Sequence, residues 1–132
     1  MMAANVKIVK RFDRVIKAVN NSLLETFGDA ARLMRAIARN SIKRRSGNRY
    51  ADPGQPPKTR YGSIRNSILF DVDKSRQEAL VGPAYTRIGP VAAAHEYGGI
   101  FRRRRYDARP FMRPALDKLI PRFPKLWQYS IR

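Results

Sequence analysis

The residues best suited to contact a ligand or partner are four consecutive arginines between two aromatic residues, in the segment FRRRRY. An arginine guanidinium can bind a phosphate or a carboxylate through two parallel hydrogen bonds. The flanking rings could stack on exposed bases or anchor the segment in the protein. We therefore expect this run to contact either DNA or an acidic protein, with simple solvation of a basic loop as the third alternative. The run consists of Arg102, Arg103, Arg104 and Arg105.

The histidine and the acidic residues do not make a recognisable catalytic set. His95 is the only histidine, and its neighbour Glu96 does not complete a metal site without further ligands at usable spacing. Asp71, Asp73 and Glu78 are close in sequence, but they surround an expected turn, where solvation explains them better than two-metal catalysis. The glycine-rich motifs G-x-x-x-x-G-K-[ST] and G-x-G-x-x-G, which cradle phosphates, are also missing. We therefore expect a protein that is not an enzyme and that holds no metal and no cofactor.

The composition favours one basic domain. The chain of 132 residues has 28 Lys and Arg against 10 Asp and Glu, a formal net charge of +18. It is predicted to fold as a single domain over residues 1–132, and its charge favours a polyanion or an acidic protein as partner. The absence of cysteine excludes disulfides and thiolate metal sites. No signal peptide and no apolar run of ~18 residues that could span a membrane is predicted.

A long amphipathic helix is predicted from about Val6 to Lys43. At ~100° per residue, one face is apolar and the opposite face is basic. The apolar positions are Ile8, Phe12, Val15, Ile16, Val19, Leu23, Phe27, Ala30, Leu33, Met34 and Ile37. The basic positions are Lys7, Lys10, Arg14, Lys17, Arg32, Arg35, Arg39 and Lys43. Because such a helix is about 55 Å long, one end is expected to protrude or to pack on a neighbouring subunit.

The rest of the chain predicts an α+β fold, in which this helix packs on a small antiparallel sheet. Turn-forming residues without apolar periodicity predict a Pro/Gly-rich loop at about 44–62. Alternating apolar residues then predict a hairpin at about 66–82, preceded by a helical turn in SIRNS. A short helix is expected at about 90–97, a basic loop or edge strand at about 98–109, and a C-terminal helix at about 111–120, where following prolines kink or end it.

Four short motifs follow one another in a distinctive order: DPGQPPKTRYGSIRNSI, LVGP, AAAHEYGG and ARPFMRPAL. This order resembles the head–tail joining or tail-completion family of tailed bacteriophages, also called minor tail or virion morphogenesis proteins. Members carry a comparable G-x-P-P…T-G-x-L-R-x-S-I stretch, a V-G-P strand end, a short helix ending E-F-G-T, and A-R-P-F-L-R-P-A-L. The resemblance spans residues 39–119. It departs from the family at EYGG and at IFRRRRYD, where the family connector is often shorter and less basic.

The resemblance implies structural or interface roles for the motif residues, and no catalytic ones. The last motif is expected to form a rigid corner, in which Pro110 and Pro114 restrict the backbone while Phe111 and Leu116 anchor it in the core. The motif glycines are expected at turns or caps. The residues concerned are Gly62, Arg65, Ser67, Ile68, Gly82, Pro83, Glu96, Tyr97, Gly98, Arg109, Pro110, Phe111, Arg113, Pro114 and Leu116.

The resemblance also implies a function. The protein would form a homo-oligomeric ring in the virion neck or tail, assembled in the host cytoplasm, that joins head and tail around the DNA channel. Its partners would be copies of itself, neighbouring neck, adaptor and tail-tube proteins, and either DNA or acidic rings beside the arginine run, with no membrane involved. Six or twelve copies, on the head side or the tail side, are equally compatible with the sequence. The alternative is a free-standing basic nucleic-acid-binding protein, which accounts for the charge but not for the order of motifs.

Overall fold

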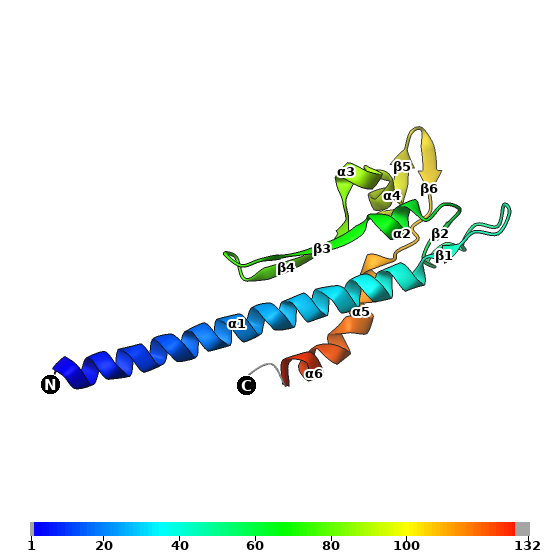
Figure 1. The fold of residues 1–132 in the computed structure, drawn as a ribbon. Helices are drawn as coiled ribbons and strands as arrows, with labels where there is room; N and C mark the ends of the chain where they lie inside the picture. The colour runs from blue at the N-terminus through cyan, green and yellow to red at the C-terminus, as the bar shows by residue number, and fades with distance from the viewer. Residues whose placement is uncertain (1, 129–132) are drawn as a thin grey trace.

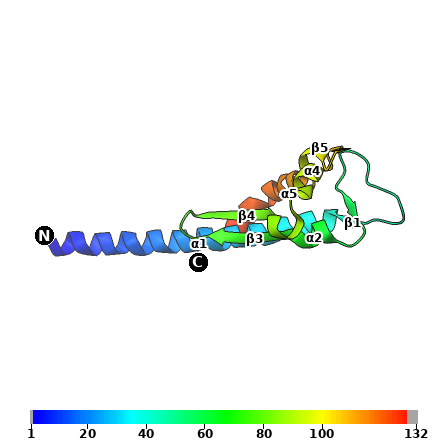
Figure 2. The same cartoon turned by 90° about the horizontal axis from the view of Figure 1, so that it is seen from above.

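The protein is built on one long helix, α1 (Met2–Ser41), with the remaining elements packed against its C-terminal half (Figure 1). The structure is a computed structural model that describes the backbone of residues 2–128 and the side chains of residues 14 and 16–128. At 1.5 Å per residue α1 is about 60 Å long, and its N-terminal part extends beyond all other elements (Figure 2). The predicted long helix and the α+β fold class are confirmed. Of the predicted apolar face, Ile8, Phe12 and Val15 lie outside the described side chains.

A β-hairpin lies along α1, as the sequence predicts. Strand β3 (Ile68–Asp73) pairs antiparallel with β4 (Glu78–Pro83), from Ile68 opposite Pro83 to Asp73 opposite Glu78. The helical turn expected before it is α2 (Ser63–Ser67). The six strands of the described chain form three separate pairs, of which this hairpin is the longest. One of these pairs, β1 (Lys43–Arg44) with β2 (Lys58–Thr59), is parallel.

Three short elements connect the hairpin to the C-terminal segment. Helix α3 (Tyr85–Ile88) was not predicted, because four residues are too few to show a periodicity. Helix α4 (Val91–Tyr97) confirms the predicted short helix and ends at Gly98. The basic segment at 98–109, predicted as a loop or edge strand, contains a second hairpin, formed by β5 (Gly99–Phe101) and β6 (Arg104–Tyr106).

The C-terminal segment crosses back under α1 as three consecutive helical turns or helices (Figure 1). Helix α5 (Met112–Leu119) matches the prediction. It continues into a 3₁₀ turn, η1 (Ile120–Arg122), and then into α6 (Phe123–Gln128). Because proline fits the first positions of a helix, Pro121 and Pro124 redirect the chain here without ending helical structure.

The core lies at the C-terminal end of α1, where α2, α4 and α5 meet it. Three of its seven residues are alanines, one each on α1, α4 and α5, where a small side chain lets these helices approach one another. Its largest member, Phe111, is completely buried. The buried cluster consists of Ala38, Ile42, Ile64, Ile68, Ala92, Phe111 and Ala115.

Candidate interaction surfaces

The carboxylate of Glu96 caps the N-terminus of α5. Its Oε2 accepts hydrogen bonds from the backbone N–H groups of Phe111 (2.8 Å) and Met112 (3.0 Å), and its Oε1 accepts one from Arg113 (2.9 Å). The first N–H groups of a helix have no partner inside the helix, so a carboxylate satisfies them and complements the helix dipole. Two motifs that are separate in the sequence, EYGG and ARPFMRPAL, therefore form one structural unit.

Gly98 makes this close approach possible. Its φ is +72°, and a Cβ at this position would lie 3.0 Å from both the backbone nitrogen of Ala108 and the carbonyl oxygen of Tyr106. Any side chain would therefore push the strand that leads to α5 away from α4. The backbone N–H of Arg109 completes the junction by donating to the carbonyl of His95. The expectation that Gly98 is a cap position is confirmed.

The same corner holds the Pro/Gly-rich loop at 44–62. Arg109 Nε donates to the carbonyl of Ala51 at 2.8 Å, and the N–H of Gly54 donates to the carbonyl of Ala108 at 2.8 Å. Ala51 and Pro57 are buried. The loop is thus attached to the body at defined points between residues 51 and 57.

The predicted anchors of the corner are only partly correct. Phe111 is fully buried, as expected. Leu116 is half-buried, and Ala115 takes the core position instead. Residues 111, 115 and 119 recur every four positions and face the core, so residue 116 is turned about 100° away. Pro110 and Pro114 are half-buried at the edge of the corner.

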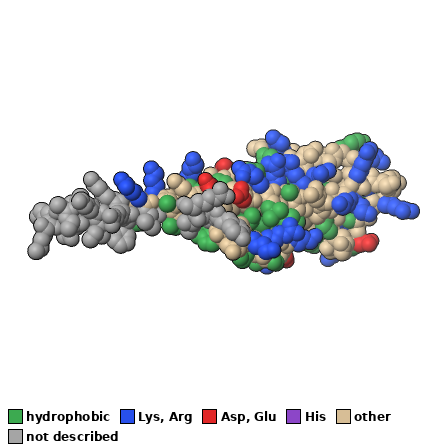
Figure 3. Space-filling model, turned by 60° about the horizontal axis from the view of Figure 1, so that its bottom comes forward, with side chains coloured by type: hydrophobic (Ala, Val, Ile, Leu, Met, Phe, Trp, Pro, Cys, Tyr) green, Lys and Arg blue, Asp and Glu red, His purple; other side chains and the backbone are tan. Residues whose placement is uncertain are grey.

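The side chain of Leu116 lines an apolar groove beneath α1. The groove has a volume of about 290 Å³ and lies between α1, β4, α5 and the start of α6. Phe27 and Phe123 face each other there, with ring centroids 6.3 Å apart. Figure 3 shows hydrophobic side chains reaching the surface in the middle of one face of the body. The apolar residues of the groove are Phe27, Ala30, Ala31, Met34, Ala79, Val81, Leu116, Leu119 and Phe123.

The first motif surrounds α2. Gly62, with φ +75°, precedes this helix, and Ile68, at its end, is completely buried. Buried Ser67 donates from Oγ to the carbonyl of Ile64 at 2.6 Å, and its own carbonyl accepts from the N–H of Ala84 at 2.8 Å. The Gly82–Pro83 strand end is thereby fixed beside α2, while Arg65 remains exposed.

Two other motif residues are on the surface. Tyr97 is 81% exposed at the end of α4. Arg113 is exposed and forms an ion pair with Asp117 on the next turn of α5, with Nε 3.3 Å from Oδ1.

The arginine run forms the tip and the return strand of the second hairpin. Arg102 and Arg103 occupy its two-residue turn with φ of 49° and 64°. Such turns favour Asn and Gly because L side chains resist positive φ. All four arginines are exposed, and none forms an ion pair within the described part of the chain. The guanidinium of Arg102 lies 5.3 Å from the centroid of the Phe101 ring, and this ring packs within the hairpin at 6.2 Å from that of Tyr106.

The acidic residues near the first hairpin stabilise its turn. Asp73 Oδ1 accepts hydrogen bonds from the Ser75 hydroxyl and from the backbone N–H groups of Ser75 and Arg76. The bond from the Ser75 hydroxyl contributes most to lowering the pKa of Asp73. Arg76 lies within 3.8 Å of Asp73 and 3.9 Å of Glu78. In the described residues, no three His, Cys, Asp or Glu side chains are close enough together to hold a metal ion.

His95 is half-buried beside the corner, with its ring 5.8 Å from that of Tyr106. Its Nδ1 is buried and has no hydrogen-bond partner among the described atoms. Burial, and then the positive charge of Arg109, lower the pKa of this imidazole. The site therefore favours the neutral form of the ring.

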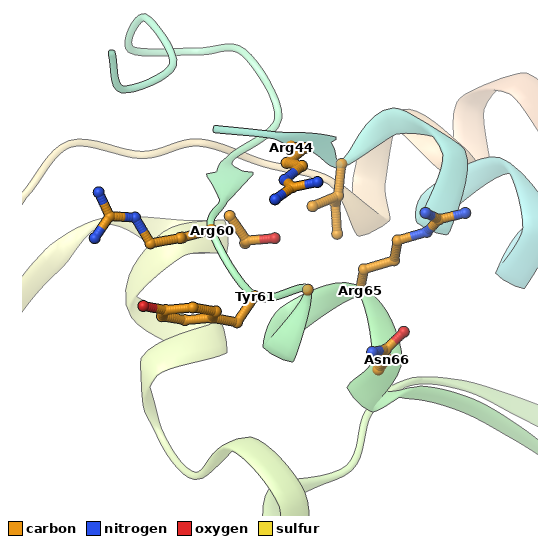
Figure 4. A pocket seen from close by; sticks show the side chains of 8 residues that line it. Arg44, Arg60, Tyr61, Arg65 and Asn66 are labelled. Carbon is orange, nitrogen blue, oxygen red and sulfur yellow. The ribbon is translucent and has the colours of Figure 1, made fainter. Parts of the chain in front are cut away.

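A second arginine-rich surface was not predicted, because its arginines come from separate segments of the sequence. One cavity of about 340 Å³ lies between the end of α1, β1, β2 and α2. Figure 4 shows Arg44 between Arg60 and Arg65, with Tyr61 beside Arg60. A second cavity, of about 500 Å³, lies between α1, α2 and β3 and shares Arg65 with the first. We call their arginines the arginine surface: Arg32, Arg35, Arg39, Arg44, Arg60 and Arg65.

The available signal for this surface was the spacing of Arg32, Arg35 and Arg39, which places them on one stripe of α1. The sequence alone offered no reason to bring Arg44, Arg60 and Arg65 next to that stripe.

Within the described chain, no helix is both long and apolar enough to cross a membrane. Comparison with models of protein families, with curated proteins and with solved structures finds no match.

Proposed function

We propose that this protein is a structural component of a tailed-phage neck or tail, which forms a homo-oligomeric ring joining head and tail around the DNA channel. The ring would assemble by docking, with no chemical step. The observation that carries the proposal is the shape of the subunit, whose longest helix has an apolar face that the subunit itself covers only in part.

That apolar face continues beyond the body. Phe27 and Met34 on α1 line the apolar groove, and Ile16 and Val19 lie on the same side of the helix at 100° per residue. Ile16 is nevertheless 55% exposed and Val19 37% exposed. Exposed apolar surface on a long helix favours burial against a neighbouring molecule, and a second copy of this chain is the partner that a ring requires.

The corner gives the proposal further support. The motifs that carry the resemblance to the phage family meet in one unit, where Glu96 caps α5 and Arg109 fixes the Pro/Gly-rich loop. Such a unit can present a fixed surface to adjacent rings.

The first test concerns assembly of the purified chain. We expect light scattering after size exclusion to give a defined oligomer, and negative-stain images to show rings. Ile16→Glu with Val19→Glu should dissociate the oligomer. Ala18→Glu with Asn21→Glu is the matched control, because both positions are exposed, lie on the opposite side of α1, and change the net charge equally.

The second test concerns the neck itself. Purified protein should join isolated heads to isolated tails from particles that lack it, and the apolar-face variant should not. The proposal would be refuted if the chain stayed monomeric at all concentrations and also failed to join heads to tails. In that event, strong and salt-sensitive binding to DNA would favour a free-standing nucleic-acid-binding protein.

A further inference from the structure

We propose that the arginine surface is a binding site for the phosphodiester backbone of a nucleic acid. The arginine run is continuous in sequence and lies at the tip of a hairpin. The arginine surface differs because α1, β1, the β2–α2 connection and α2 each contribute to it, and it lines two adjoining cavities. Phosphate binding at this surface does not require the oligomeric ring, so this inference is independent of the proposed function.

Part of the surface is held in place before any ligand binds. Arg39 Nη2 donates to the carbonyl of Ile68 at 2.8 Å, which fixes its guanidinium between α1 and the first hairpin. Arg32 and Arg35 lie over the ring of Phe70, at 5.7 and 5.3 Å from its centroid. Ordering these long side chains in advance reduces the entropy that binding must overcome.

The positive charge of the surface is almost uncompensated. Only Arg32 has a carboxylate partner in the described chain, an exposed pair with Asp29 at 3.0 Å. Burial lowers the pKa of Arg39, and the neighbouring charges of Arg35, Arg65 and Arg87 lower it further. The Nε of Arg39 is buried without a partner among the described atoms. A bound anion would relieve this repulsion.

The side chains of the surface suit phosphate groups and an adjoining base. Within the described chain, every basic side chain that lines the two cavities is Arg, and no Lys, Asp or Glu lines either cavity. The arginine fork fits phosphate oxygens through two bonds, which a lysine ammonium cannot do. Beside Arg60, the ring of Tyr61 is 83% exposed and available for stacking on a base.

The spacing also suits a nucleic-acid strand. Arg32 and Arg39 are two turns apart on α1, which is about 10 Å along the helix axis. Phosphates of one strand of a duplex rise by ~3.4 Å each, so this distance spans about three of them. An acidic protein partner would in addition need an apolar centre to its interface. Of the described apolar residues that line the two cavities, Ile42 is buried and Phe70 lies beneath Arg32 and Arg35, which leaves Ala36 and Tyr61.

The test compares two variants that each lose four positive charges. In the first, Gln replaces Arg35, Arg44, Arg60 and Arg65. In the second, the matched control, Gln replaces Lys74, Lys118, Arg122 and Lys125, which are exposed and line neither cavity. Arg39 is left unchanged because it bonds to the backbone of Ile68. Binding to a short fluorescent duplex is followed by anisotropy from about 50 to 300 mM salt, the range over which phosphate contacts are strongly weakened.

We expect the arginine-surface variant to bind at least about tenfold more weakly than the unmodified chain, a change of about 1.4 kcal/mol. The slope of log K against log salt should fall by about three to four, at ~0.9 for each lost phosphate contact. The control variant should keep its slope within about one of the original value. An arginine-surface variant that binds like the unmodified chain would overturn the inference. Equal losses in the two variants would also overturn it, since bulk charge would then explain both.

Two further measurements keep the inference open to refutation. Poly-glutamate should displace the labelled duplex less effectively than unlabelled DNA that is added at the same concentration of charge. Equally effective displacement would instead assign the surface to an acidic protein. If the arginine-surface variant does not fold, as judged by circular dichroism, the unmodified chain is treated with phenylglyoxal with and without duplex. Protection of Arg44, Arg60 and Arg65 by DNA is the expected result, and protection confined to the arginine run would overturn the inference.

Discussion

Replacing Glu96 by Ala should destabilise the protein, because this one carboxylate accepts three backbone hydrogen bonds at the start of α5. The N–H groups of Phe111 and Met112 are partly buried, so water replaces the lost bonds poorly, whereas the N–H of Arg113 is exposed and becomes solvated. A helix N-cap contributes about 0.5–2 kcal/mol, and a buried donor left without an acceptor costs about 1–3 kcal/mol. We therefore expect Glu96→Ala to lower the free energy of unfolding by about 2–4 kcal/mol.

Urea denaturation followed by circular dichroism measures this loss, and the melting temperature should fall by about 10 °C. Glu96→Gln keeps one acceptor oxygen and should lose about half as much. Glu25→Ala makes the same chemical change at an exposed position of α1 and should alter stability by less than about 0.5 kcal/mol. Hydrogen exchange should also become faster at the amides of residues 111 and 112. A Glu96→Ala variant as stable as Glu25→Ala, with unchanged exchange at those amides, would refute the capping role.

Two further predictions concern the same corner. Phe111→Ala should cost about 3–5 kcal/mol in urea denaturation because the ring is completely buried. Phe101→Ala, at a half-buried ring, should cost clearly less, and equal losses would remove Phe111 from its central place in the core. Since burial and Arg109 lower the pKa of His95, the unfolded chain binds a proton here at a higher pH than the folded chain does. Stability should therefore be complete above about pH 6.5 and decrease as the pH falls below that value. Melting temperatures at about pH 7.5 and pH 5.5 should differ more for the natural chain than for His95→Gln, and an equal difference would show that His95 is not responsible.

Helix α1 contributes to both proposed interactions, with different faces. Phe27, Ala31 and Met34 face the apolar groove. At 100° per residue, Arg32, Arg35 and Arg39 are centred about 100° around the helix from them. Figure 3 shows Lys and Arg prevailing over Asp and Glu on one face of the body, around exposed hydrophobic side chains. Contact between copies through the apolar face and phosphate binding at the arginine surface can therefore occur in the same molecule. The variants proposed for each leave the other surface intact.

Local patterns in the sequence were sufficient for most of the elements. The 3.6-residue period of α1, the alternation in the first hairpin, and glycine at the end of α4 each act within one segment, so they could be recognised without the fold. The patterns failed where an element was too short to show a period, as in α3 and the two-residue strands β1 and β2. They also failed at Leu116. Whether Ala115 or Leu116 faces the core depends on the residue at which α5 begins.

The sequence by itself determined a basic, largely helical chain with a long amphipathic helix, and it identified the arginine run and the motif residues. It did not determine which distant residues meet. Only the tertiary structure placed the carboxylate of Glu96 at the start of α5 and brought Arg44, Arg60 and Arg65 beside the arginines of α1. The reason is physical: helix and strand periods depend on neighbours a few residues apart, whereas a cap between helices or a cluster of charges depends on how whole elements pack. That packing is governed by buried contacts between segments up to tens of residues apart, such as the bond from Arg109 to Ala51.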